Sequence, residues 1–264
     1  MATARGEFRS RLGFLFAAAG SAVGLGNIWG FPTQAASNGG AAFLITYLAL
    51  AFVLAYPALM AELLIGRHTH QNMVTALSSL PKHRFWQRLG ALTGIGGLIT
   101  ASLILSFYGI VSGWMLGFAA SYPLDAIGLS SQSDWLIGFG NSRNLLLMLL
   151  FMAMTMGVVL GGVEDGIERW SRRLMPLLIV TLIGLALYVL TLDGALTGLK
   201  IYLLPDFNKI LSGELLLDAL GSAFFSLSLG VGTMLIYGSY LSDWEHVPTI
   251  GAQVALLDVG IAVL

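Results

Sequence analysis

Two apolar stretches of the chain each contain a cluster of glycines and small polar residues. The first is GSAVGLGN at Gly20–Asn27, and the second is SLSLGVG at Ser226–Gly232. Each glycine weakens a helix by about 1 kcal/mol relative to alanine, so both clusters favour a break in a helix. A break frees backbone carbonyls, which suit a small cation such as Na⁺, and helix N-termini, which attract a carboxylate. The clusters therefore predict a binding site for both a small cation and a carboxylate.

Tight helix packing is the alternative explanation for these glycines, because small residues let neighbouring backbones approach. Gly20 and Gly24 have the spacing that such packing uses. Packing does not explain a second cluster five helices later, nor the polar residues in both. Interrupted helices at corresponding positions of two repeats are typical of a transporter binding site near the middle of the bilayer.

The composition places both clusters in a membrane. Of the 264 residues, 56% are hydrophobic and only 10% are charged, whereas a soluble domain carries about 25% charged residues. The absence of cysteine excludes disulfide scaffolds and thiolate metal sites, and a net charge of −1 offers no attraction for nucleic acid. We expect an all-α membrane protein in the lipid bilayer, with no enzymatic activity and no nucleic-acid partner.

Seven apolar segments are candidates for membrane-spanning helices, because a helix needs about 20 mostly apolar residues to cross the bilayer. They are approximately Leu12–Ser37, Ala41–Ile65, Leu89–Tyr122, Leu145–Gly162, Leu174–Leu192, Leu215–Leu241 and Thr249–Leu264. The glycine clusters lie in the first and the sixth. The seventh ends within an apolar run, so we expect residues 1–264 to form a single transmembrane domain that is incomplete at its C-terminus.

The distribution of lysine and arginine predicts the orientation of these segments. With a cytoplasmic N-terminus, ten of the 13 basic residues lie inside, namely Arg5, Arg9, Arg11, Arg67, Lys82, Arg84, Arg88, Arg169, Arg172 and Arg173. The outer side then holds only Arg143, Lys200 and Lys209. We expect a multi-pass protein of the cell inner (plasma) membrane with its N-terminus in the cytoplasm, and a cytoplasmic turn at Arg169–Arg173.

Several motifs together resemble those of a known family. They are GSAVGLGNIWGFP at Gly20–Pro32 with Gln34, Asn38-Gly39-Gly40 and Phe43 after it, FFSLSLGVGTMLIYGSY at Phe224–Tyr240, and Tyr108, Trp114 and a turn at Gly166–Arg169. This set resembles the neurotransmitter:sodium symporter family. The resemblance implies the leucine-transporter fold, with broken helices 1 and 6 and an inverted repeat. The chain would hold the first repeat (helices 1–5, about 12–192), helix 6 and part of helix 7 (about 215–264).

The resemblance also implies two sodium sites and makes Na⁺ the coupling ion. The first would contain Ala22, Asn27, Ser226 and Asp258, and the second the backbone carbonyls of Gly20 and Val23. Each polar residue has a structural alternative as well. Asn27 could form a hydrogen bond between helices, and Asp258 could pair with a cation, although no lysine or arginine lies in the middle of a predicted span.

A substrate site between the two breaks is implied in the same way. It would contain Ala22, Gly24, Leu25, Gly26, Ile104, Tyr108, Phe225, Ser228 and Val231. Tyr108 and the amides around Leu25 and Gly26 would bind the substrate carboxylate, although Tyr108 could also be an ordinary buried ring. Gly24 stands where monoamine carriers of the family have an aspartate, so the substrate should bring its own carboxylate. We expect an α-amino acid with a hydrophobic or aromatic side chain.

The resemblance extends to the gates and to chloride. Arg5, Ser239 and Tyr240 match residues of the inner gate, whereas Gly30 replaces an arginine of the outer gate. Ser222 replaces the glutamine of chloride-dependent members, so chloride is not expected although Tyr47 matches. We expect Asp258 to supply the negative charge instead, and to take up a proton when the site empties, which would permit proton counter-transport.

Two other functions compete with sodium-coupled symport of an amino acid by alternating access. A seven-span receptor or retinal pump would need an outside N-terminus, and a retinal pump also needs a lysine that Thr249–Leu264 lacks. An ion channel would need a repeated filter or a ring of charged residues. Glu62 lies near the end of an apolar segment, where a structural role is as reasonable as a functional one. No oligomeric state is predicted.

Overall fold

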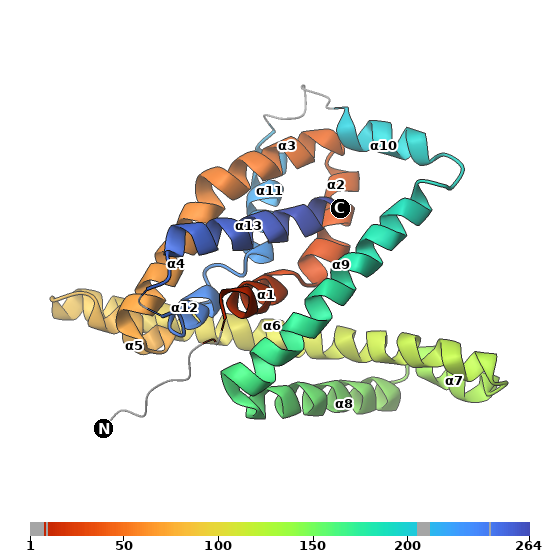
Figure 1. Cartoon of the computed structure of the whole chain (residues 1–264), viewed down its shortest axis with the longest axis horizontal. Coiled ribbons are helices and arrows are strands. Elements are labelled where there is room, and N and C mark those ends of the chain that lie inside the picture. The colour runs from red at the N-terminus through yellow and green to blue at the C-terminus, as the bar shows by residue number, and fades with distance from the viewer. Residues whose placement is uncertain (1–7, 9, 205–211, 243) are drawn as a thin grey trace.

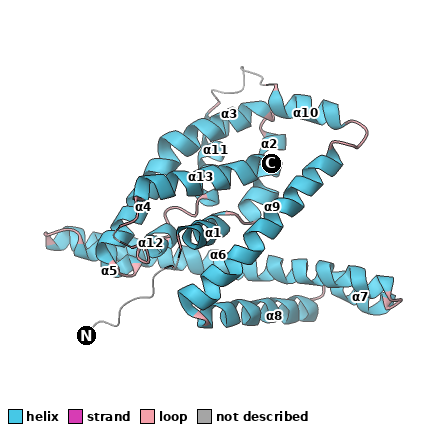
Figure 2. Cartoon of the chain, viewed as in Figure 1, coloured by secondary structure: helices cyan, strands magenta, loops and turns pink. Residues whose placement is uncertain are grey.

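A computed structural model describes residues 8, 10–204, 212–242 and 244–264. Within these residues the chain forms helices joined by turns, and no strand occurs among them (Figure 2). Four continuous helical segments are long and apolar enough to cross a membrane: Ala41–Thr69, Arg84–Ala126, Asn141–Leu160 and Gly162–Val189. The bent pair Arg11–Ala22 and Gly26–Ser37 makes a fifth. The described chain is all-α, with several helices of membrane-spanning length.

The first span is interrupted in its middle. Helix α1 (Arg11–Ala22) ends because the backbone of Val23 is extended, with φ −74° and ψ 106°. A π-helical turn, η1 (Gly26–Gly30), and α2 (Phe31–Ser37) follow, and the direction changes by 52°. The interruption lies inside the glycine cluster Gly20–Asn27.

A second interruption separates α11 (Gly213–Ser226) from α12 (Thr233–Gly238). Three residues of the intervening segment have positive φ angles: Ser228 (53°), Gly230 (82°) and Gly232 (77°). Glycine adopts such angles without strain, whereas a serine there must be held by its surroundings. The regular helix therefore stops within the second glycine cluster.

The other spans are long helices, some of which continue through a π-helical turn. They are α3 (Ala41–Leu50), η2 (Ala51–Ala55) and α4 (Tyr56–Thr69); α6 (Arg84–Ala126); α8 (Asn141–Leu160); η3 (Gly162–Glu168) and α9 (Arg169–Val189); and α13 (Val247–Val263). Short helices lie between them, namely α5 (Met73–Ser79), α7 (Ser130–Ile137) and α10 (Ala195–Leu203). These helices match the predicted spans closely, except for the fifth.

The turns predicted at Gly166–Arg169 and Arg169–Arg173 are wrong, because both ranges are helical. The chain reverses earlier, at Gly162, whose φ is +74°, and the helix then runs from there to Val189. One of its polar residues, Glu168, is buried against the start of α1, whereas Arg169, Arg172 and Arg173 are exposed. Glu168 is 2% exposed and accepts a hydrogen bond from Ser10 Oγ at 2.9 Å.

Helix α1 lies near the centre of the molecule (Figure 1) and contacts α9, α12 and α13. The largest hydrophobic core joins α1 to α3, α4, α11 and α13 through residues such as Phe14, Phe43, Leu59, Ala223 and Val254. Helix α6 runs beside α8 (Figure 1). This arrangement places the first interruption between Tyr108 of α6 and Asp258 of α13.

Candidate functional site

Asn27, Ser226 and Asp258 form a buried polar cluster, although they lie far apart in the sequence. Asn27 Nδ2 donates to Asp258 Oδ1 at 2.8 Å and to Ser226 Oγ at 2.8 Å. Ser226 Oγ donates to Asp258 Oδ2 at 2.7 Å. None of the three is more than 4% exposed. The cluster therefore joins both interrupted helices to α13.

The Asp258 carboxylate and the Ser226 hydroxyl offer oxygen ligands, which suit a small hard cation. The Asn27 amide oxygen accepts from the Gly24 amide at 3.2 Å, at the first interruption. Ala22, the last residue of α1, is buried beside the interruption. The Tyr47 hydroxyl is also buried next to Asp258, and no described residue meets it in hydrogen-bonding geometry. Such a group is costly to bury unless a polar ligand joins it.

Gly20 and Val23, whose carbonyls are the predicted ligands of the second sodium site, both lie against α9. A Cβ atom placed on Gly20 would be 3.3 Å from the Met175 sulfur of α9 and 4.0 Å from Ser171 Oγ. Val23 packs in a small apolar cluster with Met175 and Ile261. Gly20 and Val23 are therefore outside the hydrogen-bonded cluster of Asn27, Ser226 and Asp258.

Tyr108 lies against the first interruption. A Cβ atom placed on Gly24 would be 3.0 Å from the Tyr108 hydroxyl, so a larger residue at this position would crowd it. Gly26 faces the ring of Phe225. A Cβ atom placed on Gly26 would be 2.8 Å from this ring. The amides of Leu25 and Gly26 lie close to the Tyr108 hydroxyl. A hydroxyl and two N–H groups therefore converge, which suits a carboxylate.

A cavity of ≈ 250 Å³ opens between α6 and the second interruption. Five predicted substrate residues line it: Ile104, Tyr108, Phe225, Ser228 and Val231. Five further residues were not predicted: Ser21, Ala101, Leu105, Leu229 and Thr233. Helical spacing could have identified Ala101 and Leu105, since they lie one turn from Ile104 and Tyr108. No sequence signal identifies the others as lining residues.

Ser228 connects the two interruptions. Its Oγ donates to the carbonyl of Ser21 at 3.1 Å. This bond helps to hold the positive φ of Ser228, so the two irregular segments support each other.

Glu62 of α4 anchors the second interruption and so has a structural role. Its Oε1 accepts from the Gly230 amide at 2.7 Å, and its Oε2 accepts from the Leu235 amide at 3.3 Å. These N–H groups have no helical partner because the helix is broken before them. A carboxylate in an apolar span was the available signal, but only the folded chain shows what it binds.

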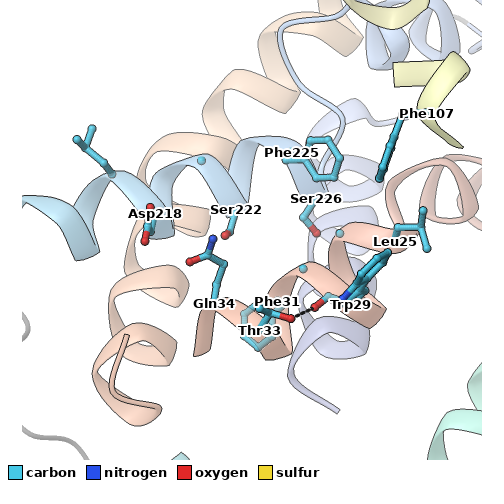
Figure 3. A pocket seen from close by; sticks show the side chains of 14 residues that line it. Leu25, Trp29, Phe31, Thr33, Gln34, Phe107, Asp218, Ser222, Phe225 and Ser226 are labelled. Carbon is cyan, nitrogen blue, oxygen red and sulfur yellow. Dashed lines mark hydrogen bonds between the residues drawn. The ribbon is translucent and has the colours of Figure 1, made fainter. Parts of the chain in front are cut away.

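A second cavity of ≈ 490 Å³ lies between α11 and the segment from η1 to α2 (Figure 3). Asp218, Gln34 and Ser222 lie on its polar side (Figure 3). Asp218 Oδ2 accepts from Asn38 Nδ2 at 3.0 Å, and Asn38 Nδ2 also donates to Gln34 Oε1 at 3.0 Å. Phe225 lines both cavities and so lies between them.

The predicted gate residues can be located only in part, because Arg5 lies outside the described residues. Ser239 is 1% exposed, and its carbonyl oxygen lies 2.9 Å from His70 Nδ1. The ring of Tyr240 meets that of Phe8 edge-on, with centroids 6.5 Å apart. Ser239 and Tyr240 therefore follow the end of α12, close to the start of α1 and the end of α4.

Comparisons with known proteins agree on one family. The model of the "Sodium:neurotransmitter symporter family" matches residues 5–135 and 129–263. The "Uncharacterized sodium-dependent transporter YhdH" of Bacillus subtilis is 38% identical over 98% of this chain. The "Sodium- and chloride-dependent GABA transporter 2" of Mus musculus is 26% identical over 89% of it.

A solved structure is also similar along almost the whole chain. The crystal structure of MhsT in complex with L-phenylalanine matches with a TM-score of 0.84 and 40% identity, over 98% of this chain. The chain spans 59% of that structure, 57% of YhdH and 45% of the mouse transporter. It therefore corresponds to about half the length of the proteins it matches.

Proposed function

Because the chain belongs to the sodium:neurotransmitter symporter family, we propose that its protein couples the movement of Na⁺ to the uptake of an α-amino acid by alternating access. Family membership and the apolar helices make it a multi-pass membrane protein. Its relatives are transporters rather than enzymes, which also disfavours a receptor or a channel. A cytoplasmic N-terminus, in the inner (plasma) membrane, is part of the proposal.

The buried carboxylate of Asp258 is the observation that carries this proposal. Asp258 is fully buried, and within the described residues no cation pairs with it. A buried charge is costly unless a partner neutralises it. Na⁺ bound by Asp258, Asn27 and Ser226, with the carbonyl of Ala22, would supply that partner. The carbonyls of Gly20 and Val23 would contribute to a second Na⁺.

The substrate would lie between the interruptions, in the cavity of ≈ 250 Å³. Its carboxylate would meet the Tyr108 hydroxyl and the amides of Leu25 and Gly26. The carbonyl of Ser228 would accept from its ammonium group. Apolar walls favour a hydrophobic or aromatic side chain, as does the L-phenylalanine bound in the structural relative.

Alternating access requires the site to open to one side at a time. Phe225 lines both the cavity of ≈ 250 Å³ and the cavity of ≈ 490 Å³, and it is 46% exposed. Rotation of its ring would open or close the connection between them. At the other end, Ser239, Tyr240 and Arg5 would belong to the inner gate.

Uptake of labelled L-phenylalanine into proteoliposomes tests this function. We expect an inward Na⁺ gradient to drive accumulation, and an equal choline gradient to drive none, because substrate and cation would bind at adjacent positions. Equal uptake in both gradients would contradict sodium coupling.

We further expect transport to be independent of chloride, because Asp258 would supply the negative charge at the first sodium site. Replacing chloride by gluconate should leave uptake unchanged. Asp258→Asn should lower the apparent Na⁺ affinity by at least roughly tenfold, since it removes a charge from the site. Sodium titrations of uptake measure this effect.

Asp134→Asn, on the exposed helix α7, is the matched control and should behave like the parent protein. Strict chloride dependence of the parent would contradict the role of Asp258, and so would an unchanged Na⁺ affinity in Asp258→Asn. Release of protons on sodium binding, absent in Asp258→Asn, would be the sign of proton counter-transport.

A further inference from the structure

Threonines inside the long helices pair their hydroxyl groups with their own helix. In five of them the hydroxyl donates to the carbonyl four residues earlier, at 2.8–3.0 Å: Thr46, Thr93, Thr100, Thr155 and Thr181. This bond satisfies the hydroxyl in an apolar environment. Thr233 differs, because its hydroxyl has no hydrogen-bond partner within the described part of the chain.

The break in the helix explains why Thr233 is different. It is the first residue of α12 and follows Gly232, whose φ is +77°. The residue four positions earlier, Leu229, belongs to the non-helical segment, so no carbonyl of the same helix is in reach. The side chain instead lines the cavity of ≈ 250 Å³. The Thr233 hydroxyl is thus available to form a hydrogen bond with a ligand in this cavity.

Thr233 and Tyr108 lie toward opposite ends of the cavity. Ala101, Ile104 and Tyr108 line it along α6, and Tyr108 lies seven positions after Ala101, or about 10 Å along the helix. A Cβ atom placed on Gly97, one turn beyond Ala101, would be 3.5 Å from the Val231 carbonyl. The residues from Val231 to Thr233 therefore lie beside the end of the cavity that Ala101 lines.

The walls between these ends are mostly apolar, with Ile104, Leu105 and Leu229 among them. A flat apolar ring fits between such walls, and only its far edge would reach a hydroxyl group. The phenol of tyrosine has this form, because its ring carries one O–H opposite the point of attachment.

We propose that Thr233 determines specificity by pairing its hydroxyl with the ring hydroxyl of a tyrosine-like substrate. This inference rests on the proposed function, since the substrate carboxylate must first be held near Tyr108. Phenylalanine has the same ring without the hydroxyl, so it leaves Thr233 unpaired. A site built to bind a substrate hydroxyl discriminates against the analogue that lacks it.

The test compares L-tyrosine with L-phenylalanine in the parent protein, in Thr233→Val and in Thr233→Ser. Binding of each amino acid in Na⁺ is measured with the full-length protein in detergent. Valine keeps the shape of threonine and removes the hydroxyl, and serine keeps the hydroxyl. We expect Thr233→Val to weaken the binding of L-tyrosine by roughly three- to tenfold relative to that of L-phenylalanine. Thr233→Ser should retain the ratio of the two affinities found in the parent protein.

Thr100→Val is the matched control, because the Thr100 hydroxyl is exposed and bonds to the Gly96 carbonyl. It should leave the ratio of the two affinities unchanged. An equal effect of Thr233→Val on both amino acids, or no effect on either, would overturn the role of Thr233. Failure of the parent protein to bind either amino acid in Na⁺ would instead contradict the proposed function.

Discussion

Replacing Asn27 with alanine is expected to lower the apparent affinity for Na⁺ by roughly 10- to 100-fold, the range for losing hydrogen bonds to a charged group. Asn27 contributes to the proposed sodium site and donates to Asp258 and Ser226. Without the amide, Ser226 is the one side chain among the described residues that still donates to the buried carboxylate. The measurement is a sodium titration of amino-acid binding and of uptake in proteoliposomes.

The same substitution should weaken the binding of the amino acid as well. If Na⁺ and the carboxylate of the substrate touch, each raises the affinity of the other by the same factor, typically about 5–150-fold. Asn141→Ala, at the exposed start of α8, is the control and should change neither affinity. Membrane insertion should be normal in both variants. A parent-like sodium titration of Asn27→Ala would refute the assignment of this site.

The second large effect concerns the carboxylate of the substrate. We expect L-phenylalanine to bind at least roughly 100-fold more tightly than phenylethylamine, its decarboxylated form, because a site built for a charged group is left unpaired without it. Tyr108 and the amides of Leu25 and Gly26 converge on this point. Gly24 offers no carboxylate that could bind a free amine instead. Competition binding in Na⁺ gives both affinities.

Tyr108→Phe should reduce this preference, because it removes the hydroxyl and leaves the ring. Tyr188→Phe, on the exposed surface of α9, makes the same chemical change away from the cavity and should have no effect. Tight binding of the amine together with weak binding of the amino acid would exclude an amino-acid substrate.

Composition and local pattern were sufficient for the membrane environment and for most helices. An apolar run of sufficient length forms a helix in a bilayer whatever its neighbours are, because the backbone must satisfy its own hydrogen bonds there. The glycine clusters mark the interruptions for an equally local reason, the weak helix propensity of glycine. The family resemblance added Asn27, Ser226 and Asp258, which the structure brings together.

Contacts between distant segments were decided only by the tertiary structure. The polar residues around Glu168 were predicted to form a turn, but they are helical, and Glu168 is buried against Ser10 of the distant N-terminal segment. Glu62 caps the interrupted helix from another span, and no local pattern specifies that partner. The Thr233 hydroxyl lacks the usual carbonyl partner because the preceding break removes it, and the side chain lines a cavity that other helices complete. Periodicity describes one helix at a time, whereas the partner of a buried polar group depends on which helices pack together.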